Sequence, residues 1–167
     1  HFPGHNDQSP NTHYDIAQIN IKNDQWDEYI YTFKYPVDKG IVDVIMVGHI
    51  KFPMIDDKPA TVSKVIINEK LRKEMGYSGV VITDDMQMDS IWEYGKYCNT
   101  AKEALLAGND ILLYSQYTQR ATLLIDIYNC ILNAVTSGQI DENIIDQKVL
   151  RILKLKIKYG LIDETTL

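Results

Sequence analysis

The chain has 167 residues, long enough for one domain with a substantial hydrophobic core. Hydrophobic residues make up 45% and charged residues 24% of the chain, as in an ordinary globular protein, and its longest apolar runs are too short to span a bilayer. The net charge of -6 at pH 7 disfavours nucleic acid and anionic membrane surfaces as partners.

The first 14 residues have the composition of a loop, rich in His, Asn, Asp, Pro and Gly. His1 and His5 are spaced as a metal-binding pair would be on a helix, but Pro3 and Gly4 between them disfavour a helix. A solvated loop and a functional loop therefore both remain open. Because the chain begins without Met inside this histidine-rich stretch, we expect it to be a fragment of a longer protein.

Two helices and a buried strand are predicted in the next part of the chain. An amphipathic helix is expected over Asp24–Tyr35, interrupted by Pro36. The apolar run Ile41–Val47 has the pattern of a buried strand. Residues Phe52–Pro59 are expected to form a loop, and Ser63–Met75 a second helix with an apolar face.

The second half of the chain repeats this alternation. Two more strands are predicted, over Gly79–Thr83 and Asp110–Tyr114, and periodic apolar residues predict helices over Thr100–Ala107, Gln119–Val135 and Asp141–Lys158. Strands that alternate with helices are typical of an α/β fold with a parallel sheet. The two cysteines, Cys98 and Cys130, have no paired metal spacing, and we expect them to be small, buried apolar residues.

Polar residues follow each predicted strand: His49 the first, Asp84 and Asp85 the second, Tyr114 and Ser115 the third. The carboxyl ends of parallel strands carry the chemistry in α/β folds. Glycosyl transfer by a carboxylate nucleophile with a separate acid/base suits these residues, and so does metal binding by His and Asp. An acidic Mg²⁺ and phosphoacceptor pocket would need a lysine where Tyr114 and Ser115 stand. The alternative is an aspartate that merely caps the following helix.

Five segments resemble, in the same order, motifs of glycoside hydrolase family 3 and in particular of its bacterial β-N-acetylglucosaminidases. They are His1-Phe-Pro-Gly-His5 with His13-Tyr14, the M-V-G-H-I-x-F-P-x-I-D run from Met46 to Asp56, Pro59-Ala-Thr-Val-Ser63, the run from Leu71 to Met88 that contains I-T-D-D-M, and Ala107-Gly-Asn-Asp110. These motifs span nearly the whole chain.

The resemblance implies a (β/α)₈ barrel of the TIM type, of which this chain would carry the second half. On that mapping the first residues end strand five, and the later apolar runs are strands six, seven and eight, followed by a C-terminal helix. A whole barrel needs about 250 residues. We therefore expect one partial catalytic barrel domain over residues 1–167 and no second domain.

The resemblance also implies roles for residues. Asp84 falls on the nucleophile of a retaining mechanism, and His13 falls on the histidine that serves as general acid/base in the acetylglucosaminidase branch. Asn11 stands where the family has the aspartate that accompanies this histidine, and an amide cannot stabilise imidazolium by charge. The residues expected to contact the sugar are His1, His5, His49 and Met86.

The expected function is hydrolysis of β-linked N-acetylglucosaminides through a covalent glycosyl-aspartate, with weak or no activity for this chain alone. The alternative is a sugar-binding or scaffold protein that has lost catalysis, for which Asn11 and the short length argue. The expected partner is an amino-sugar glycan, with a second copy or the missing N-terminal half covering the open sheet edges. We expect no cofactor and no metal. The resemblance is to bacterial enzymes, and it leaves a cytoplasmic and a cell-wall-associated location open.

Overall fold

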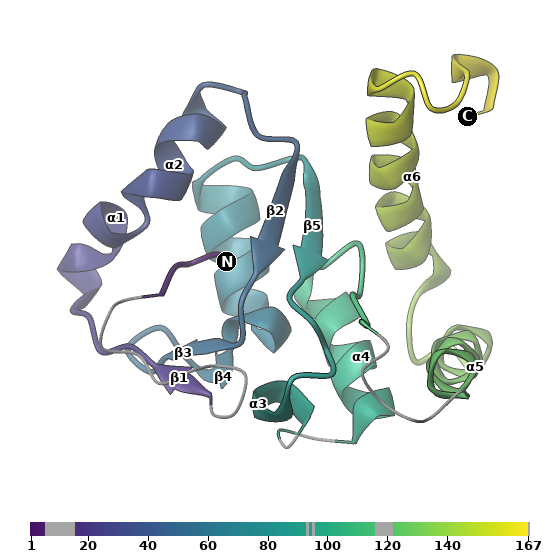
Figure 1. Cartoon of the computed structure of the whole chain (residues 1–167), viewed down its shortest axis with the longest axis horizontal. Helices are drawn as coiled ribbons and strands as arrows, with labels where there is room; N and C mark the ends of the chain where they lie inside the picture. The colour runs from purple at the N-terminus through teal and green to yellow at the C-terminus, as the bar shows by residue number, and fades with distance from the viewer. Residues whose placement is uncertain (6–15, 93, 95, 116–121, 167) are drawn as a thin grey trace.

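A computed structural model describes residues 1–5, 16–92, 94, 96–115 and 122–166, and it has a mixed α/β fold. Two strands at its centre, β2 (Val44–Val47) and β5 (Val80–Thr83), pair in parallel, and helices lie on both sides of them (Figure 1). Both apolar runs predicted as buried strands are therefore confirmed, each shortened at its amino end. The strands bring the residues that follow Val47 and Thr83 to one edge of the sheet.

Single parallel bridges extend this pair on both sides. Phe2 pairs with Val47, and Ile82 pairs with Ile111. The prediction of a full strand over Asp110–Tyr114 is wrong, because the backbone ladder stops after one bridge and the N–H of Leu113 donates to the side-chain hydroxyl of Thr83 at 2.9 Å. Four chain segments thus lie in parallel in the order in which they occur along the chain.

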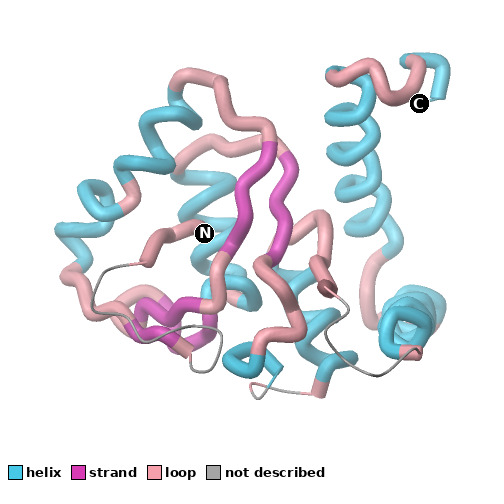
Figure 2. Tube along the Cα trace, viewed as in Figure 1, coloured by secondary structure: helices cyan, strands magenta, loops and turns pink. Residues whose placement is uncertain are grey.

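A second small sheet lies below the first in the view of Figure 2. It consists of β1 (Ala17–Gln18), β3 (Ile50–Phe52) and β4 (Asp56–Pro59), in the order β1-β3-β4. The loop predicted over Phe52–Pro59 is therefore wrong, because β3 and β4 pair antiparallel across a short turn. Strand β4 has no apolar run that would predict a strand, because its middle residues face solvent. An antiparallel edge strand permits such exposure.

The first helical region is split into three pieces. The helix predicted over Asp24–Tyr35 is formed by η1 (Asn23–Gln25), α1 (Trp26–Tyr29) and α2 (Tyr31–Asp38). The break falls at Ile30, whose carbonyl accepts from the N–H groups of both Phe33 and Lys34, and not at Pro36. Pro36 lies inside α2, which continues past it because proline removes only one N–H donor from the helix.

The predicted second helix is η3 (Val65–Glu74), a π-helix that packs close to α4 (Tyr97–Ala107). The contact is made at Gly108, where α4 ends with a φ of +123°. A Cβ at this position would lie 2.5 Å from Asn68 Oδ1 and 2.7 Å from Ile67 Cγ2. Both the backbone conformation and the space therefore require glycine here.

The last two predicted helices are confirmed with shifted ends, as α5 (Leu123–Thr136) and α6 (Glu142–Lys158). Three short helices were not predicted: η2 (Ala60–Val62), α3 (Asp89–Trp92) and η4 (Glu164–Thr166). Helix α6 begins after Asp141, whose side chain accepts from the N–H of Asn143 at 3.0 Å and so caps the helix. Within the part of the chain that is described, no helix is long and apolar enough to cross a membrane.

The core fixes the first residues of the chain against β2. Phe2 is fully buried and makes edge-to-face contacts with Trp26 and Phe33, at ring-centroid distances of 6.4 and 5.3 Å. Its N–H donates to the carbonyl of Met46 at 2.7 Å. His1 is therefore held beside the carboxyl end of the sheet, because its neighbour is a core residue.

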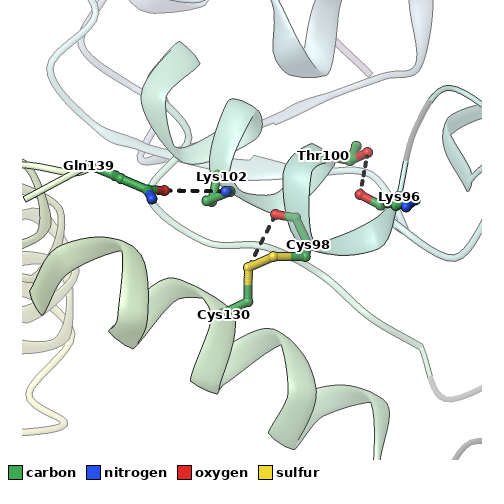
Figure 3. The surroundings of a disulfide bond; sticks show 6 residues. All are labelled: Lys96, Cys98, Thr100, Lys102, Cys130 and Gln139. Atoms are coloured by element: carbon green, nitrogen blue, oxygen red, sulfur yellow. Dashed lines mark hydrogen bonds between the residues drawn. A yellow bond between two sulfur atoms is a disulfide. The ribbon is translucent and has the colours of Figure 1, made fainter. Parts of the chain in front are cut away.

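A disulfide joins α4 to α5 (Figure 3). The sulfurs of Cys98 and Cys130 are bonded, with their Cα atoms 5.9 Å apart, and both residues are half-buried. The expectation of two separate, buried cysteines is wrong, since the packing of the two helices brings together residues that lie 32 positions apart in the sequence. The bond closes a loop that runs from the start of α4 to the middle of α5.

A buried ion-pair cluster joins α6 to the amino end of the sheet. The side chain of Asp110 is fully buried, and its two oxygens accept from Arg72 Nη2 and Arg151 Nε, each at 2.8 Å. The N–H of Val81 also donates to this carboxylate at 2.8 Å. Lys148 of α6 donates to the carbonyl of Asn109 at 2.7 Å and is only 4% exposed.

Candidate active site

The candidate site begins where β5 ends. The N–H of Asp84 donates to the carbonyl of Val47 at 2.9 Å, so the pairing with β2 continues one residue beyond the strand. This bond fixes the backbone of Asp84 at the edge where Phe2, β2 and β5 finish. The Asp84 side chain is 14% exposed, so it is largely surrounded by protein and still open to a ligand.

The two oxygens of Asp84 have different surroundings. Oδ1 accepts from the N–H of Asp85 at 2.8 Å, which fixes the orientation of the carboxylate. Oδ2 lies 3.5 Å from Nε2 of His1. Among the described residues, no backbone or hydroxyl group donates to Oδ2. One oxygen is therefore held by the protein, and the other points toward the histidine loop.

Asp85 has both oxygens occupied by the protein. Oδ1 accepts from the N–H groups of Gln87 at 3.0 Å and Ser115 at 3.2 Å, and Oδ2 accepts from the Ser115 hydroxyl. Asp85 thus joins the end of β5 to the segment that follows Ile111. Its carboxylate stabilises the edge of the sheet, and protein groups already donate to both of its oxygens.

His1 and His5 lie together above this edge. Their rings meet edge to face with centroids 5.8 Å apart. Burial lowers the pKa of His5 below its usual value, and the negative charge of Asp84 opposes that shift. The structure therefore brings His1, His5 and Asp84 into one group, while their roles toward a sugar stay predictions. Within the described ranges, no group of three His, Cys, Asp or Glu residues is arranged to hold a metal ion.

His49 and Met86 lie beneath the site. His49 is 0% exposed, and both of its ring nitrogens are hydrogen-bonded to protein, Nδ1 to the Thr61 hydroxyl at 2.7 Å and Nε2 to the Asp85 carbonyl at 2.9 Å. Met86 is buried in an apolar cluster with Val62, Ile91 and Ala104. Both residues are buried here, and their expected contact with the sugar stays a prediction.

His13 and Asn11 lie outside the described residues, so their positions relative to Asp84 are not part of this geometry. Two residues of the site were not predicted from the sequence as members of it. Ser115 was noted only as a polar strand end, and Thr61 only as part of a motif. The position of Ser115 after a predicted strand could have indicated that it belongs to the site, whereas no local pattern indicates this for Thr61.

Comparison with known proteins places the chain in a family. Residues 1–155 match the model of the "Glycosyl hydrolase family 3 N terminal domain". A β-hexosaminidase of Hydrogenovibrio crunogenus is 34% identical over 117 residues, which cover 68% of this chain and 32% of the relative. A β-hexosaminidase of Nitrosomonas eutropha is 30% identical over 143 residues, which cover 84% of this chain and 40% of the relative.

A solved structure shows the same arrangement of elements. The glycoside hydrolase family 3 β-N-acetylglucosaminidase of Paenibacillus sp. superimposes with a TM-score of 0.87 at 34% identity, over 96% of this chain and 30% of that protein. The chain thus spans only about a third of the length of these relatives. On the family match, the similar sequences and the shared fold, this chain belongs to glycosyl hydrolase family 3.

Proposed function

We propose that this chain carries the nucleophile of a glycoside hydrolase that cleaves β-linked N-acetylglucosaminides, and that the nucleophile is Asp84. One observation carries the choice between the adjacent carboxylates. Asp85 accepts hydrogen bonds at both oxygens, whereas Asp84 has one oxygen fixed and one directed toward the histidine loop. A nucleophile needs a fixed orientation and an oxygen that is available for bonding.

The proposed reaction has two steps. Asp84 Oδ2 attacks the anomeric carbon, forming a glycosyl ester as the bond to the aglycone oxygen breaks and that oxygen takes a proton from the general acid. Water then attacks the same carbon, gives its proton to the same group acting as base, and releases Asp84. The anomeric configuration is retained because each step inverts it. The names of the β-hexosaminidase relatives support the amino-sugar specificity.

The other residues of the proposed site are assigned by the family resemblance. We propose His13 as general acid/base, with Asn11 beside it in place of an aspartate, and His1 as a contact to sugar hydroxyls. His5 lies in edge contact with His1 and within the electrostatic reach of Asp84, which supports a place in the sugar-binding loop. A neutral histidine exchanges protons near pH 7 and suits the acid/base role.

We also propose that the chain forms the second half of a (β/α)₈ barrel. Four parallel segments in chain order support this, and so does the fraction of the relatives that the chain spans. Among the described residues, no strand pairs with the outer edges of Phe2 and Ile111, and the first half would cover them. The chain alone would then lack part of the sugar site. A sugar-binding protein without turnover is the second candidate, favoured by Asn11.

Substitution of Asp84 tests this proposal. In the longest native form of the protein, Asp84→Asn should reduce hydrolysis of p-nitrophenyl N-acetyl-β-glucosaminide by at least about a thousandfold, because the amide is not a nucleophile. Asp146→Asn, at an exposed aspartate of α6, is the matched control and should leave the rate unchanged. Turnover that survives in Asp84→Asn would reject the assignment. Sugar binding without turnover in the unsubstituted protein would favour the second candidate.

A further inference from the structure

We propose that His49 is a positioning residue for Asp84, acting through the backbone of Asp85. The effect of His49 on catalysis rests on the proposed function of Asp84 as nucleophile. The hydrogen bonds of His49 do not depend on that function. His49 follows β2, and the Asp84–Asp85 pair follows the neighbouring strand β5. The histidine ring therefore lies between the two strand ends and joins them.

The ring of His49 makes one contact on each side. Nε2 lies 2.9 Å from the carbonyl oxygen of Asp85, and Nδ1 lies 2.7 Å from Oγ1 of Thr61. A carbonyl oxygen can only accept, so Nε2 must carry a proton. Burial lowers the pKa of His49 and favours the neutral ring, although Asp84 and Asp85 oppose this shift. On the other side of the ring, the Thr61 hydroxyl next to Nδ1 also donates to the carbonyl of Gly48 at 2.9 Å.

The contact with the Asp85 carbonyl controls the orientation of Asp84. The N–H of Asp85 donates to Asp84 Oδ1, and the side chain of Asp85 is fixed by Gln87 and Ser115. His49 fixes the remaining polar group of Asp85, its carbonyl. With its carbonyl and carboxylate held, Asp85 has less freedom to turn about its Cα, which favours the observed direction of its N–H toward Asp84 Oδ1. The Asp85 carbonyl also accepts from the N–H of Met88 at 3.0 Å, so loss of the histidine contact would remove one of its two donors and loosen this turn.

Thr61 is itself fixed from the opposite side. Its carbonyl accepts from Asn109 Nδ2 at 2.8 Å, and the same nitrogen donates to the carbonyl of Ala104 at 2.7 Å. Thr61, Asn109 and His49 are all fully buried. A buried polar network of this kind holds one geometry, because any displaced member leaves an unpaired group. His49 therefore rests on a rigid support and not on a mobile surface group.

Two near-isosteric substitutions separate the two contacts of the ring. His49→Gln places an amide donor near the position of Nε2, so it can keep the bond to Asp85. His49→Asn places its amide near the position of Nδ1, so it can keep only the bond to Thr61. Both variants remove the imidazole, and thermal melting shows whether they lose the same stability.

Amide exchange and steady-state kinetics provide the readouts. In His49→Asn we expect the Asp85 amide to exchange roughly tenfold faster, while His49→Gln stays close to the unsubstituted protein. In the longest native form, His49→Asn should lower kcat about 10- to 100-fold for p-nitrophenyl N-acetyl-β-glucosaminide, because misplacement of a nucleophile is costly. KM should stay within about twofold, since on this proposal His49 acts on Asp84 and not on the sugar.

The outcomes that would overturn the inference are distinct. Equal kcat and equal Asp85 exchange in the two variants would mean that His49 only supports the fold. A raised KM with unchanged kcat in His49→Asn would indicate that His49 contributes to sugar binding and not to the position of Asp84. If the unsubstituted protein does not hydrolyse the substrate, the proposed function fails, and the Asp85 exchange of the two variants alone decides whether His49 positions this peptide.

Discussion

Two aspartates at opposite ends of the same short sheet show how differently one residue type can be used. Asp110, at the amino end, has a fully buried carboxylate that accepts from Arg72, Arg151 and the N–H of Val81. Asp84, at the carboxyl end, has one oxygen held by a single N–H and the other near His1. Occupied lone pairs mark a structural carboxylate, and an available oxygen marks a candidate for chemistry.

The largest expected effect is a contrast in stability between these two aspartates. Asp110→Asn should lower the free energy of unfolding by about 3–5 kcal/mol, because it removes the buried negative charge that two partly buried arginines share. Asp84→Asn should change it by less than about 1 kcal/mol, since the amide oxygen can still accept from Asp85. Urea unfolding of both variants measures the contrast. Equal losses of unfolding free energy in the two variants would show that both carboxylates are structural, which would contradict the contrast drawn between Asp110 and Asp84.

Removal of the disulfide between Cys98 and Cys130 tests whether one cross-link stabilises both the amino and the carboxyl end of the sheet. Its loop contains both Asp110 and Ser115, so it encloses one group from each end of the sheet. Replacing both cysteines with serine should lower the free energy of unfolding by about 3–4 kcal/mol, from the entropy of the released loop. Unfolding of the unsubstituted protein with and without a thiol reductant is the matched control. An unchanged midpoint in reductant would contradict this expectation.

The smallest effect concerns Lys148, which adds a buried charge to the amino end. Burial lowers the pKa of Lys148 to about 8, since Asp110 only partly offsets it and the charges of Arg151 and Arg72 disfavour the protonated form. Between pH 8 and pH 10 the folded protein releases this proton before the unfolded chain does. Stability should therefore rise with pH in this window, by roughly 2 kcal/mol.

Lys148→Met provides the control for this pH dependence. Thermal melting measured at intervals from pH 7 to pH 10 should rise in the unsubstituted protein and stay flatter in the variant. A slope of the same size in both proteins would assign the pH dependence to other groups. The carboxyl end should not add to this rise, because no lysine or arginine lies in direct contact with Asp84 among the described residues and burial raises the pKa of Tyr114, which lowers stability near pH 10.

The sequence predicted the parts of this molecule that depend on apolar patterns. The runs that contain Ile45 and Val81 identified the paired strands, and their ends located Asp84 at the edge of the sheet. The extended run at Asp110–Tyr114 was also visible, but not that its backbone pairing would stop at Ile111, since a side-chain hydroxyl competes for Leu113. Strand β4 was missed because its pairing partner, and not its own apolar content, makes it a strand.

The parts that could not be predicted depend on distant contacts. Nothing in the spacing of Cys98 and Cys130 indicates that α4 and α5 bring them together. His49 was expected to contact the sugar on the family resemblance of its motif, which carries no information about burial. Its burial depends on Thr61 and Asp85, which lie 12 and 36 positions away in the sequence. Hydrophobic periodicity carries no information about such polar pairs.

The absence of a side chain at Gly108 constrains how this fold can be modified. A Cβ there would collide with Ile67 and Asn68 of η3. The end of α4 therefore packs directly on η3, with no side chain between them. Helix α4 leads directly into Asn109 and Asp110, so any displacement would pass to the core of the sheet. A chimera that imports α4 from another family member should therefore import its η3 as well, because the two helices form one exchangeable unit.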